Sequence, residues 1–316
     1  MRSAGRYPAL FQVNTRARLS ELARGLGRPA TLDDVTDAEL DGLAADGFDL
    51  VWFLGVWQTG QAARRVSRSK PEWLEEYRRV LPDFREKDVT GSCFAVREYR
   101  VHEDFGGDAA LARLRERLRS RGLRLILDFV PNHVAPDHAW VERHPEYFVA
   151  GTEESLASQP QNWARAGDRI LAYGRDPYFD GWPDTFQLNY GNPALQDAML
   201  GELSRIARQC DGVRCDMAML VLPEVFDKTW GIAHQPFCHR APLRSARRHG
   251  LQPNRAGGTI DGGTSLGDPQ EQPAAQGRCR RVRRPQRQGD RDRKPDPYAL
   301  LQERKLRQGR RLRSRA

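Results

Sequence analysis

No long apolar run occurs in this 316-residue sequence, and none approaches the roughly 20 residues that a membrane-spanning helix requires. The N-terminus contains Arg2 and Arg6 but lacks the apolar core of a signal peptide. Cysteine is scarce and scattered, and Cys210 and Cys215 have no neighbouring Cys/His pair that would complete a zinc site. We therefore expect a cytoplasmic protein with free thiols and no membrane partner.

The last quarter of the chain is poor in large apolar side chains. All seven Trp and all four Met precede residue 237, and residues 237–316 carry 21 basic against 7 acidic side chains. A segment with so few apolar groups cannot offset its chain entropy, so we expect it to be disordered. Its arginine clusters suit phosphate contacts, but it has only two aromatic residues to stack bases. Nucleic acid is therefore not the expected partner.

Four apolar runs predict strands, at residues 9–13, 48–54, 123–130 and 211–216. The third run is apolar on both faces except near its end, which is typical of parallel strands covered by helices. Helix-favouring stretches separate the runs. This alternation predicts an α/β fold.

Two of the predicted helices have a clear apolar stripe, and others are expected at residues 19–26 and 71–79. We expect Asp108 to cap the first striped helix and Gly122 to end it, while Asn192 precedes the second. The stripes consist of Leu111, Leu114 and Leu118 in the first helix, and of Leu195, Met199, Leu203 and Ile206 in the second.

About 75 residues separate the strand ending near Asp128 from the strand starting near Asp211, far more than one crossover helix needs. This distance predicts an inserted excursion. Residues 174–184 within it are rich in turn formers and aromatic residues. Such a loop above a rigid sheet is expected to form a wall of a substrate site.

Polar residues gather where two predicted strands end, at Asp128 and at Arg214–Asp216. In a barrel the carboxyl ends of the strands face the active site. A carboxylate beside Arg is expected to stay ionised, and it can then attack an anomeric carbon or stabilise an oxocarbenium ion. The alternative is that these carboxylates only cap strand ends or pair with Arg.

Five segments, in order and with matching spacing, resemble the α-amylase family of glycoside hydrolases over about residues 8–231. Two resemble the signature regions at the third and fourth barrel strands, one the signature near the end of the inserted domain, and two the loop before the third barrel helix. They are residues 128–133 (DFVPNH), 212–218 (GVRCDMA), 183–189 (PDTFQLN), 91–99 and 102–107.

The resemblance implies an α/β fold of the (β/α)8 TIM-barrel type, incomplete here because only about four of eight strands are legible. Residues 1–133 would form the first three β/α units, and residues 134–209 the inserted loop-rich domain with the helix after it. Residues 210–236 would hold the fourth strand with its following segment, and residues 237–316 the basic tail.

The resemblance also implies roles for four side chains. Asp216 corresponds to the catalytic nucleophile, and Arg214 to the arginine that keeps it ionised. Asp128 and His133 correspond to residues that hold sugar hydroxyls at the cleavage subsite.

Three further positions follow the family less closely. Either Phe94 or Tyr99 corresponds to the aromatic that stacks on the sugar. Asn132 corresponds to a calcium ligand in many members, but others lack the ion, so calcium is optional and no cofactor is required. Met219–Leu220 replaces the Lys-His of many members, so substrate preference is not indicated.

The second carboxyl group of a retaining glycosidase, about 5–5.5 Å from the nucleophile, is not found. In the family it is a Glu at the end of the next strand, and a later His-Asp pair grips the substrate. After Gly231 no apolar strand follows; Glu271 and Glu303 lie in polar sequence, and Glu224 is expected on a helix surface. We therefore expect a change of reading frame near residues 232–236 and an inactive, truncated chain.

The sequence thus predicts an α-amylase-type hydrolase or transglycosylase by descent, with an α-glucan or α-glucoside as substrate. One alternative is a sugar-binding remnant without turnover. The other is weak nucleic-acid binding through the basic tail.

Overall fold

The computed structural model describes residues 7–81 and 83–236, all within one compact unit, Met1–Pro242. The expectations of a disordered tail and of a frame change fall on residues 237–316 and so lie outside the described residues. Within the described part, no helix combines the length and the apolar character of a bilayer-spanning segment.

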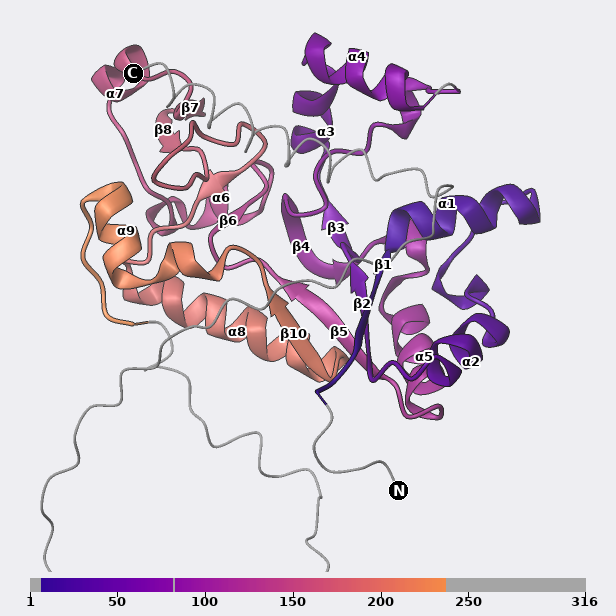
Figure 1. The fold of residues 1–316 in the computed structure, drawn as a ribbon. Coiled ribbons are helices and arrows are strands. Elements are labelled where there is room, and N and C mark those ends of the chain that lie inside the picture. The colour runs from indigo at the N-terminus through magenta and orange to yellow at the C-terminus, as the bar shows by residue number, and fades with distance from the viewer. Residues whose placement is uncertain (1–6, 82, 237–316) are drawn as a thin grey trace, which may run out of the picture. The chain divides into compact units, whose positions relative to one another are not determined.

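A four-stranded parallel sheet forms the centre of the fold, which confirms the α/β class (Figure 1). Its order is β1-β2-β5-β10, and every neighbouring pair is parallel. The strands are β1 Leu10–Asn14, β2 Leu50–Leu54, β5 Arg124–Phe129 and β10 Gly212–Cys215, each within two residues of its predicted run. The described residues form an open sheet and not a closed barrel.

One face of this sheet packs on helices. Side chains that alternate along β2 and β5 are at most 2% exposed on this face: Val51, Phe53, Leu125, Leu127 and Phe129. They share a core with the buried stripes of α5 Gly107–Arg119 and α8 Pro193–Gln209, as the two-residue period of a strand and the 3.6-residue period of a helix predict. Helices α1 Thr15–Leu26 and α2 Asp37–Ala45 also contribute to this core.

The two striped helices begin differently from one another. Asn192 caps α8 as predicted, and its side chain accepts a hydrogen bond from the Ala194 N–H. The expected cap of α5 by Asp108 is wrong. Gly106, in the left-handed region at φ 92°, turns the chain directly into α5, and the Asp108 carboxylate accepts from the Val101 N–H at 2.8 Å instead.

The remaining elements surround the carboxyl ends of the strands, and most of them were not predicted. Three antiparallel pairs are β3 Trp57–Thr59 with β4 Val96–Val101, β6 His133–Val134 with β9 Phe186–Gln187, and β7 Trp163–Ala166 with β8 Arg169–Ala172. The other α-helices are α3 Gln61–Arg68, α4 Pro71–Val80, α6 Trp140–Arg143, α7 Glu153–Ser158 and α9 Pro223–Trp230. Short 3-10 turns cover Leu32–Asp34, Glu86–Asp88, Glu103–Phe105, Pro145–Tyr147 and Ala218–Val221.

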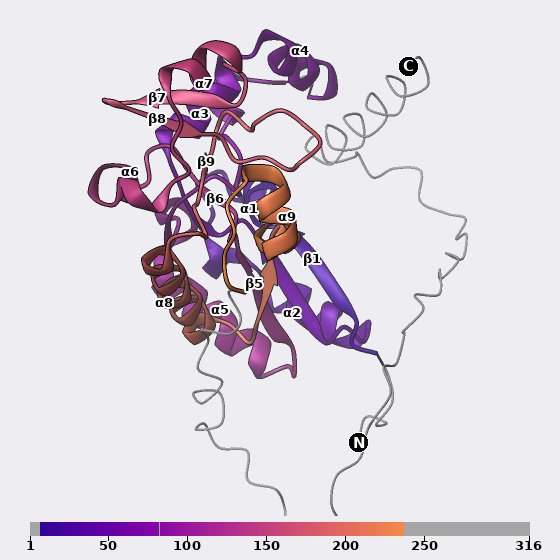
Figure 2. The same cartoon turned by 90° about the vertical axis from the view of Figure 1, so that its left-hand side faces the viewer.

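The excursion between β5 and α8 lies at this end of the sheet, next to α3 and α9 (Figure 2). It contains β6 to β9 together with α6 and α7. Its return strand β9 pairs with β6, directly after β5, through the register His133↔Gln187. The excursion is therefore anchored beside the residues that follow the third sheet strand.

Candidate active site

Three charged side chains meet where β5 and β10 end. The register of the two strands places Arg214 opposite Asp128, and the Asp216 N–H donates to the Phe129 carbonyl at 2.7 Å. The Arg214 guanidinium forms an ion pair with the Asp216 carboxylate and lies 3.8 Å from Asp128 Oδ1. The structure thus brings together the three charged residues that the sequence selected.

Asp128 is held in place from two sides. The Trp52 indole donates to its Oδ1 at 3.1 Å, and the Gly55 N–H donates to its Oδ2 at 2.8 Å. The side chain is 1% exposed, and this burial raises the pKa of Asp128 to about 7, although the Gly55 hydrogen bond and the charge of Arg214 lower it. At neutral pH this carboxyl is therefore only partly ionised, because desolvation outweighs the opposite charge of Arg214.

The Arg214 guanidinium lies over two aromatic rings. Its Cζ atom is 5.0 Å from the ring centre of Trp52 and 5.2 Å from that of Phe94. Such distances allow a cation–π attraction to each ring. The only cation beside the two carboxylates in the described chain is thus held by aromatic contacts as well as by ion pairs.

The two aromatic candidates from the sequence lie in different environments. Tyr99 is 2% exposed, and its hydroxyl donates to the Val130 carbonyl at 3.1 Å while accepting from the Val130 N–H at 2.9 Å. Phe94 is half-buried and touches Arg214. Tyr99 therefore belongs to the core, whereas Phe94 lies at the charged cluster.

His133 is a neutral side chain at this site. Burial lowers the pKa of His133 to about 4, although the negative charge of Asp216 acts in the opposite direction. Its Nδ1 lies 3.3 Å from the Asn132 side-chain nitrogen, a donor, so Nδ1 accepts and the proton is on Nε2. The Trp182 ring packs edge-on against the imidazole at 5.2 Å. The ring also has a hydrogen bond with the Phe94 backbone, which acts against the lowering of the pKa of His133, so its N–H already has a partner.

The side-chain amide of Asn132 is hydrogen-bonded to the side-chain amide of Gln187. The Gln187 amide donates to the Asn132 and Leu188 carbonyls, which fixes its orientation, and it also donates to Asn132 Oδ1 at 3.0 Å. In return, Asn132 donates to Gln187 Oε1 at 3.2 Å. The motif PDTFQLN indicates no role for Gln187, and only its long-range pairing shows what it does.

These residues do not fit a calcium ion. Calcium takes six to eight oxygen ligands, several of them carboxylates. Asn132 Oδ1 already accepts from Gln187, and the described residues contain no group of three or more His, Cys, Asp or Glu side chains that could hold a metal. Calcium therefore has no part in the chemistry discussed below.

Within the described chain, the carboxyl groups at the strand ends are those of Asp128 and Asp216. Both oxygens of Asp128 accept hydrogen bonds from N–H groups, so neither faces a leaving group with a proton to give. Glu224 is exposed in the first turn of α9, as expected. No side chain described here is therefore placed as a general acid beside Asp216.

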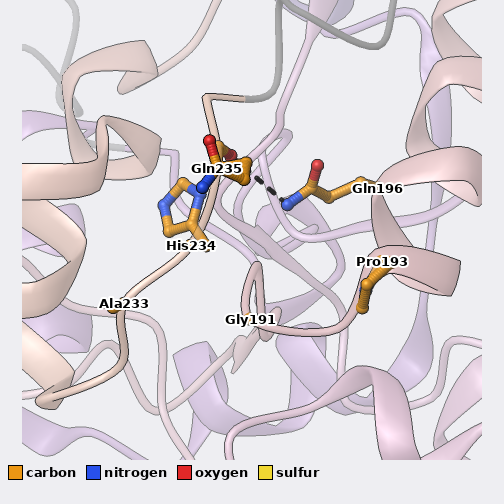
Figure 3. A pocket seen from close by; sticks show the side chains of 6 residues that line it. All are labelled: Gly191, Pro193, Gln196, Ala233, His234 and Gln235. Atoms are coloured by element: carbon orange, nitrogen blue, oxygen red, sulfur yellow. Dashed lines mark hydrogen bonds between the residues drawn. The ribbon is translucent and has the colours of Figure 1, made fainter.

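A separate cavity of about 320 Å³ opens at the start of α8 (Figure 3). Inside it, the Gln196 amide donates to the Tyr190 carbonyl at 2.7 Å and approaches the Gln235 carbonyl at 3.5 Å. Its lining consists of Gly191, Pro193, Gln196, Ala233, His234 and Gln235. None of the candidate site residues contributes to it, so the charged cluster is not inside this cavity.

Residues 79–245 match the model of the alpha amylase catalytic domain. The chain is 28% identical over 167 residues to trehalose synthase/amylase TreS of Mycobacterium tuberculosis, covering 47% of this chain and 26% of that protein. It is 30% identical over 135 residues to an alpha-glucosidase of Culex pipiens, covering 37% and 23%. The chain thus spans about a quarter of the length of these curated relatives.

Among solved structures, trehalose-6-phosphate hydrolase (TreA) of Bacillus licheniformis superposes with a TM-score of 0.50. The superposition covers 73% of this chain and 40% of that one, at 14% identity. At this identity the likeness concerns the fold alone.

Proposed function

We propose, from the premise that this chain belongs to the alpha-amylase family, that its charged cluster is the sugar-binding subsite of a glycoside hydrolase or transglycosylase for α-glucosidic bonds. The observation that carries the proposal is Arg214 between two carboxylates at the ends of adjacent parallel strands. An ionised carboxylate there lies where the barrel fold places its substrate.

In this proposal Asp216 is the nucleophile for the anomeric carbon. Arg214 orients its carboxylate through the ion pair and balances its charge before a sugar arrives. Asp128 acts differently, because its oxygens accept hydrogen bonds and its burial disfavours charge. It holds Arg214 and the adjacent sugar hydroxyls in position and takes no part in bond cleavage.

His133 and Phe94 complete the subsite. Since His133 is neutral, it contacts a sugar hydroxyl without adding a second cation beside Arg214. Phe94, half-buried against Arg214, offers the apolar surface on which a sugar ring stacks. The excursion, proposed to span residues 134–209 with the helix after it, supplies the wall above them.

Bond cleavage also needs a proton donor for the leaving oxygen. The described residues place none beside Asp216, because Asp128 is engaged by Trp52 and Gly55 and Glu224 is exposed on α9. We therefore propose that this chain binds α-glucans but turns them over far more slowly than a complete enzyme of the family.

The test combines binding and turnover. Maltooligosaccharide binding, followed by calorimetry, is expected for the full chain and is expected to weaken in His133→Ala and Phe94→Ala. Hydrolysis of a chromogenic α-glucoside is expected to stay near background. Glu224→Gln, at an exposed carboxylate on α9, is the matched control and should bind like the parent.

Two results would overturn the proposal. Binding that is unchanged in His133→Ala and Phe94→Ala would move the sugar site elsewhere. Turnover at an ordinary enzymatic rate, abolished in Asp216→Asn, would mean that an acid exists beyond the described residues.

The cellular location is also a proposal. Cys93, Cys210 and Cys215 are free thiols, which is the usual state in a reducing compartment. We place the protein in the cytoplasm on this ground. A thiol titration of protein from intact cells would contradict it by finding these cysteines oxidised.

A further inference from the structure

Two half-buried arginines, Arg16 in α1 and Arg64 in α3, have no anionic partner in the described chain. Neither forms a hydrogen bond or an ion pair with a described residue, and the covered Arg64 Nε atom has no partner at all there. By contrast, Arg113, Arg117 and Arg121 each form an ion pair with an aspartate of α2 or of the turn before it. A covered donor on a charged group is costly to leave unpaired, so the two exceptions require a reason.

The fold brings these two arginines to the same region, at the carboxyl end of the sheet (Figure 1). Gly91, at φ 83°, lies directly against α3, since a Cβ there would be 2.9 Å from the Arg64 backbone nitrogen. The Arg16 Cζ atom is 4.8 Å from the ring centre of Phe105, and the His102 ring is 5.1 Å from the same ring. Arg16 therefore points toward the segment before α5, inside the described part of the chain.

The charges of the two arginines reach one another and His102. Burial lowers the pKa of Arg16, Asp104 acts in the opposite direction, and Arg64 lowers it again. Burial also lowers the pKa of His102, and both arginines add to that lowering. His102 is therefore neutral at pH 7, and because its Nδ1 accepts from the Asp104 N–H at 3.2 Å, its proton is on Nε2.

Within the described chain, no buried anion neutralises these charges. Asp104 acts on Arg16 from a distance, but its side chain is 67% exposed and makes no ion pair with that arginine. The Cys93 thiol stays neutral, because burial raises the pKa of Cys93 to about 12. Glu103 is exposed and lies 3.3 Å from Arg100 instead. Two positive charges are thus held together without a counter-charge of their own.

A phosphate group matches this arrangement in charge and in geometry. A phosphate monoester carries a charge of about −1.5 to −2 at pH 7, which balances two guanidinium groups, whereas a carboxylate balances one. Guanidinium groups bind phosphate oxygens in pairs of parallel hydrogen bonds. Both arginines are partly exposed, so the anion can reach them from solvent.

We propose that Arg16, Arg64 and His102 form a binding site for a dianionic phosphate group. The two guanidinium groups hold its oxygens, and the His102 Nε2–H donates to it. This inference rests on the unpaired arginines and does not depend on the proposed sugar chemistry. Free phosphate and the phosphate of a sugar ester present the same group, and the experiment distinguishes them.

Calorimetry with inorganic phosphate tests the site in the full-length chain. Arg16→Gln and Arg64→Gln should each weaken binding by roughly 10-fold or more, because each removes charged hydrogen bonds. The matched controls, Arg24→Gln and Arg65→Gln, change exposed arginines of the same two helices and should bind like the parent. Residues 237–316, with 21 basic side chains, are present in every variant, so nonspecific binding there cancels.

Hydrogen exchange on the parent locates the ligand without any substitution, and so holds even if a variant fails to fold. Inorganic phosphate should slow the exchange of amides in the first turn of α1, in α3 and in residues 102–105, because binding opposes local opening. Amides of α8 should exchange at the same rate with and without phosphate.

Glucose 6-phosphate identifies the source of the phosphate group. Tighter binding of this ester than of inorganic phosphate, lost in both arginine variants, would assign the site to a phosphorylated sugar. Equal or weaker binding would assign it to free phosphate.

Three results would refute the phosphate site. They are a parent that binds no phosphate at millimolar concentration, unchanged binding in both Arg16→Gln and Arg64→Gln, and exchange that phosphate slows only outside the named segments. Equal losses in Arg24→Gln and Arg65→Gln would refute it as well, since attraction to the overall positive charge would then explain the binding.

Discussion

The ends of β5 and β10 carry the same residue type in neighbouring strands, yet the two carboxyl groups differ in their surroundings. Asp128 on β5 receives two hydrogen bonds from N–H groups and is 1% exposed. Asp216, just after β10, is 5% exposed and forms its ion pair with Arg214. Asp216 lies two residues beyond Arg214, the register partner of Asp128, and this offset gives two carboxyl groups at neighbouring strand ends different partners.

The largest effect on stability is expected from a substitution at Gly55, whose backbone N–H supports Asp128. This residue is at φ 74°, and a Cβ there would lie 2.6 Å from Cys93 Cβ. Gly55→Ala should lower the free energy of unfolding by about 2–5 kcal/mol through backbone strain and overpacking. Urea unfolding measures the change. Gly201→Ala, in open space on α8, is the control and should be neutral or stabilising.

The next largest effect on unfolding free energy is expected from replacing each of the two carboxylates in turn. Asp128→Asn turns an amide N–H₂ toward the Trp52 or Gly55 donor, which should cost about 1–3 kcal/mol of unfolding free energy. Asp216→Asn should cost less than Asp128→Asn, since the new amide oxygen still accepts from Arg214 and Arg214 keeps Asp128 as a neighbour. Equal losses in the two variants, again by urea unfolding, would show that the ends of β5 and β10 are equivalent.

The pH dependence of the free energy of unfolding allows a further comparison, between Asp128 and His133. Because the pKa of Asp128 is raised to about 7, its contribution to stability is full below about pH 4 and is lost as the pH rises through 7. Because the pKa of His133 is lowered to about 4, its contribution is full above about pH 6.5 and is lost as the pH falls through 4. As the pH rises, the contribution of Asp128 therefore lowers the free energy of unfolding, whereas the contribution of His133 raises it.

Replacing either residue should therefore reveal its own contribution to the pH dependence of stability. Between about pH 4 and 6.5, Asp128→Asn should become more stable with rising pH relative to the parent, and His133→Gln should become less stable. Urea midpoints at several pH values measure both. Parallel pH profiles for the parent and both variants would contradict the burial of these two groups.

The smallest expected effect is at Trp52. Trp52→Phe keeps an aromatic ring near Arg214 but removes the indole donor to Asp128 Oδ1. Unfolding free energy should fall by about 0.5–1.5 kcal/mol, and the pKa of Asp128 should rise further because the charged form loses a hydrogen bond. A carboxyl-carbon NMR titration detects the shift. Trp140→Phe, next to His138 in the excursion, should leave that titration unchanged.

The sheet and its helices could be predicted from the sequence because their signals are periodic and local. The run 123–130 and the stripe of Leu111, Leu114 and Leu118 each depend on a spacing of two, three or four residues. The cap of α5 could not be predicted, since Gly106 turns the chain two residues earlier than the Asp108 pattern suggests.

At the site, the identity of the charged residues could be predicted from the sequence, but their protonation and their hydrogen-bond partners could not. Strand ends indicated Asp128, Arg214 and Asp216, because parallel strands collect their carboxyl ends at one edge. The raised pKa of Asp128 depends on burial and on Gly55, 73 positions away. The occupation of Asn132 by Gln187, 55 positions away, likewise required the folded chain.

The Gln187 amide has a mechanical consequence for the excursion. It ties the returning strand β9 to the backbone carbonyl and the side-chain oxygen of Asn132, the residue directly before His133. Any outward swing of the excursion must therefore break these bonds. Shortening or exchanging the loop would remove the support of the segment that carries His133.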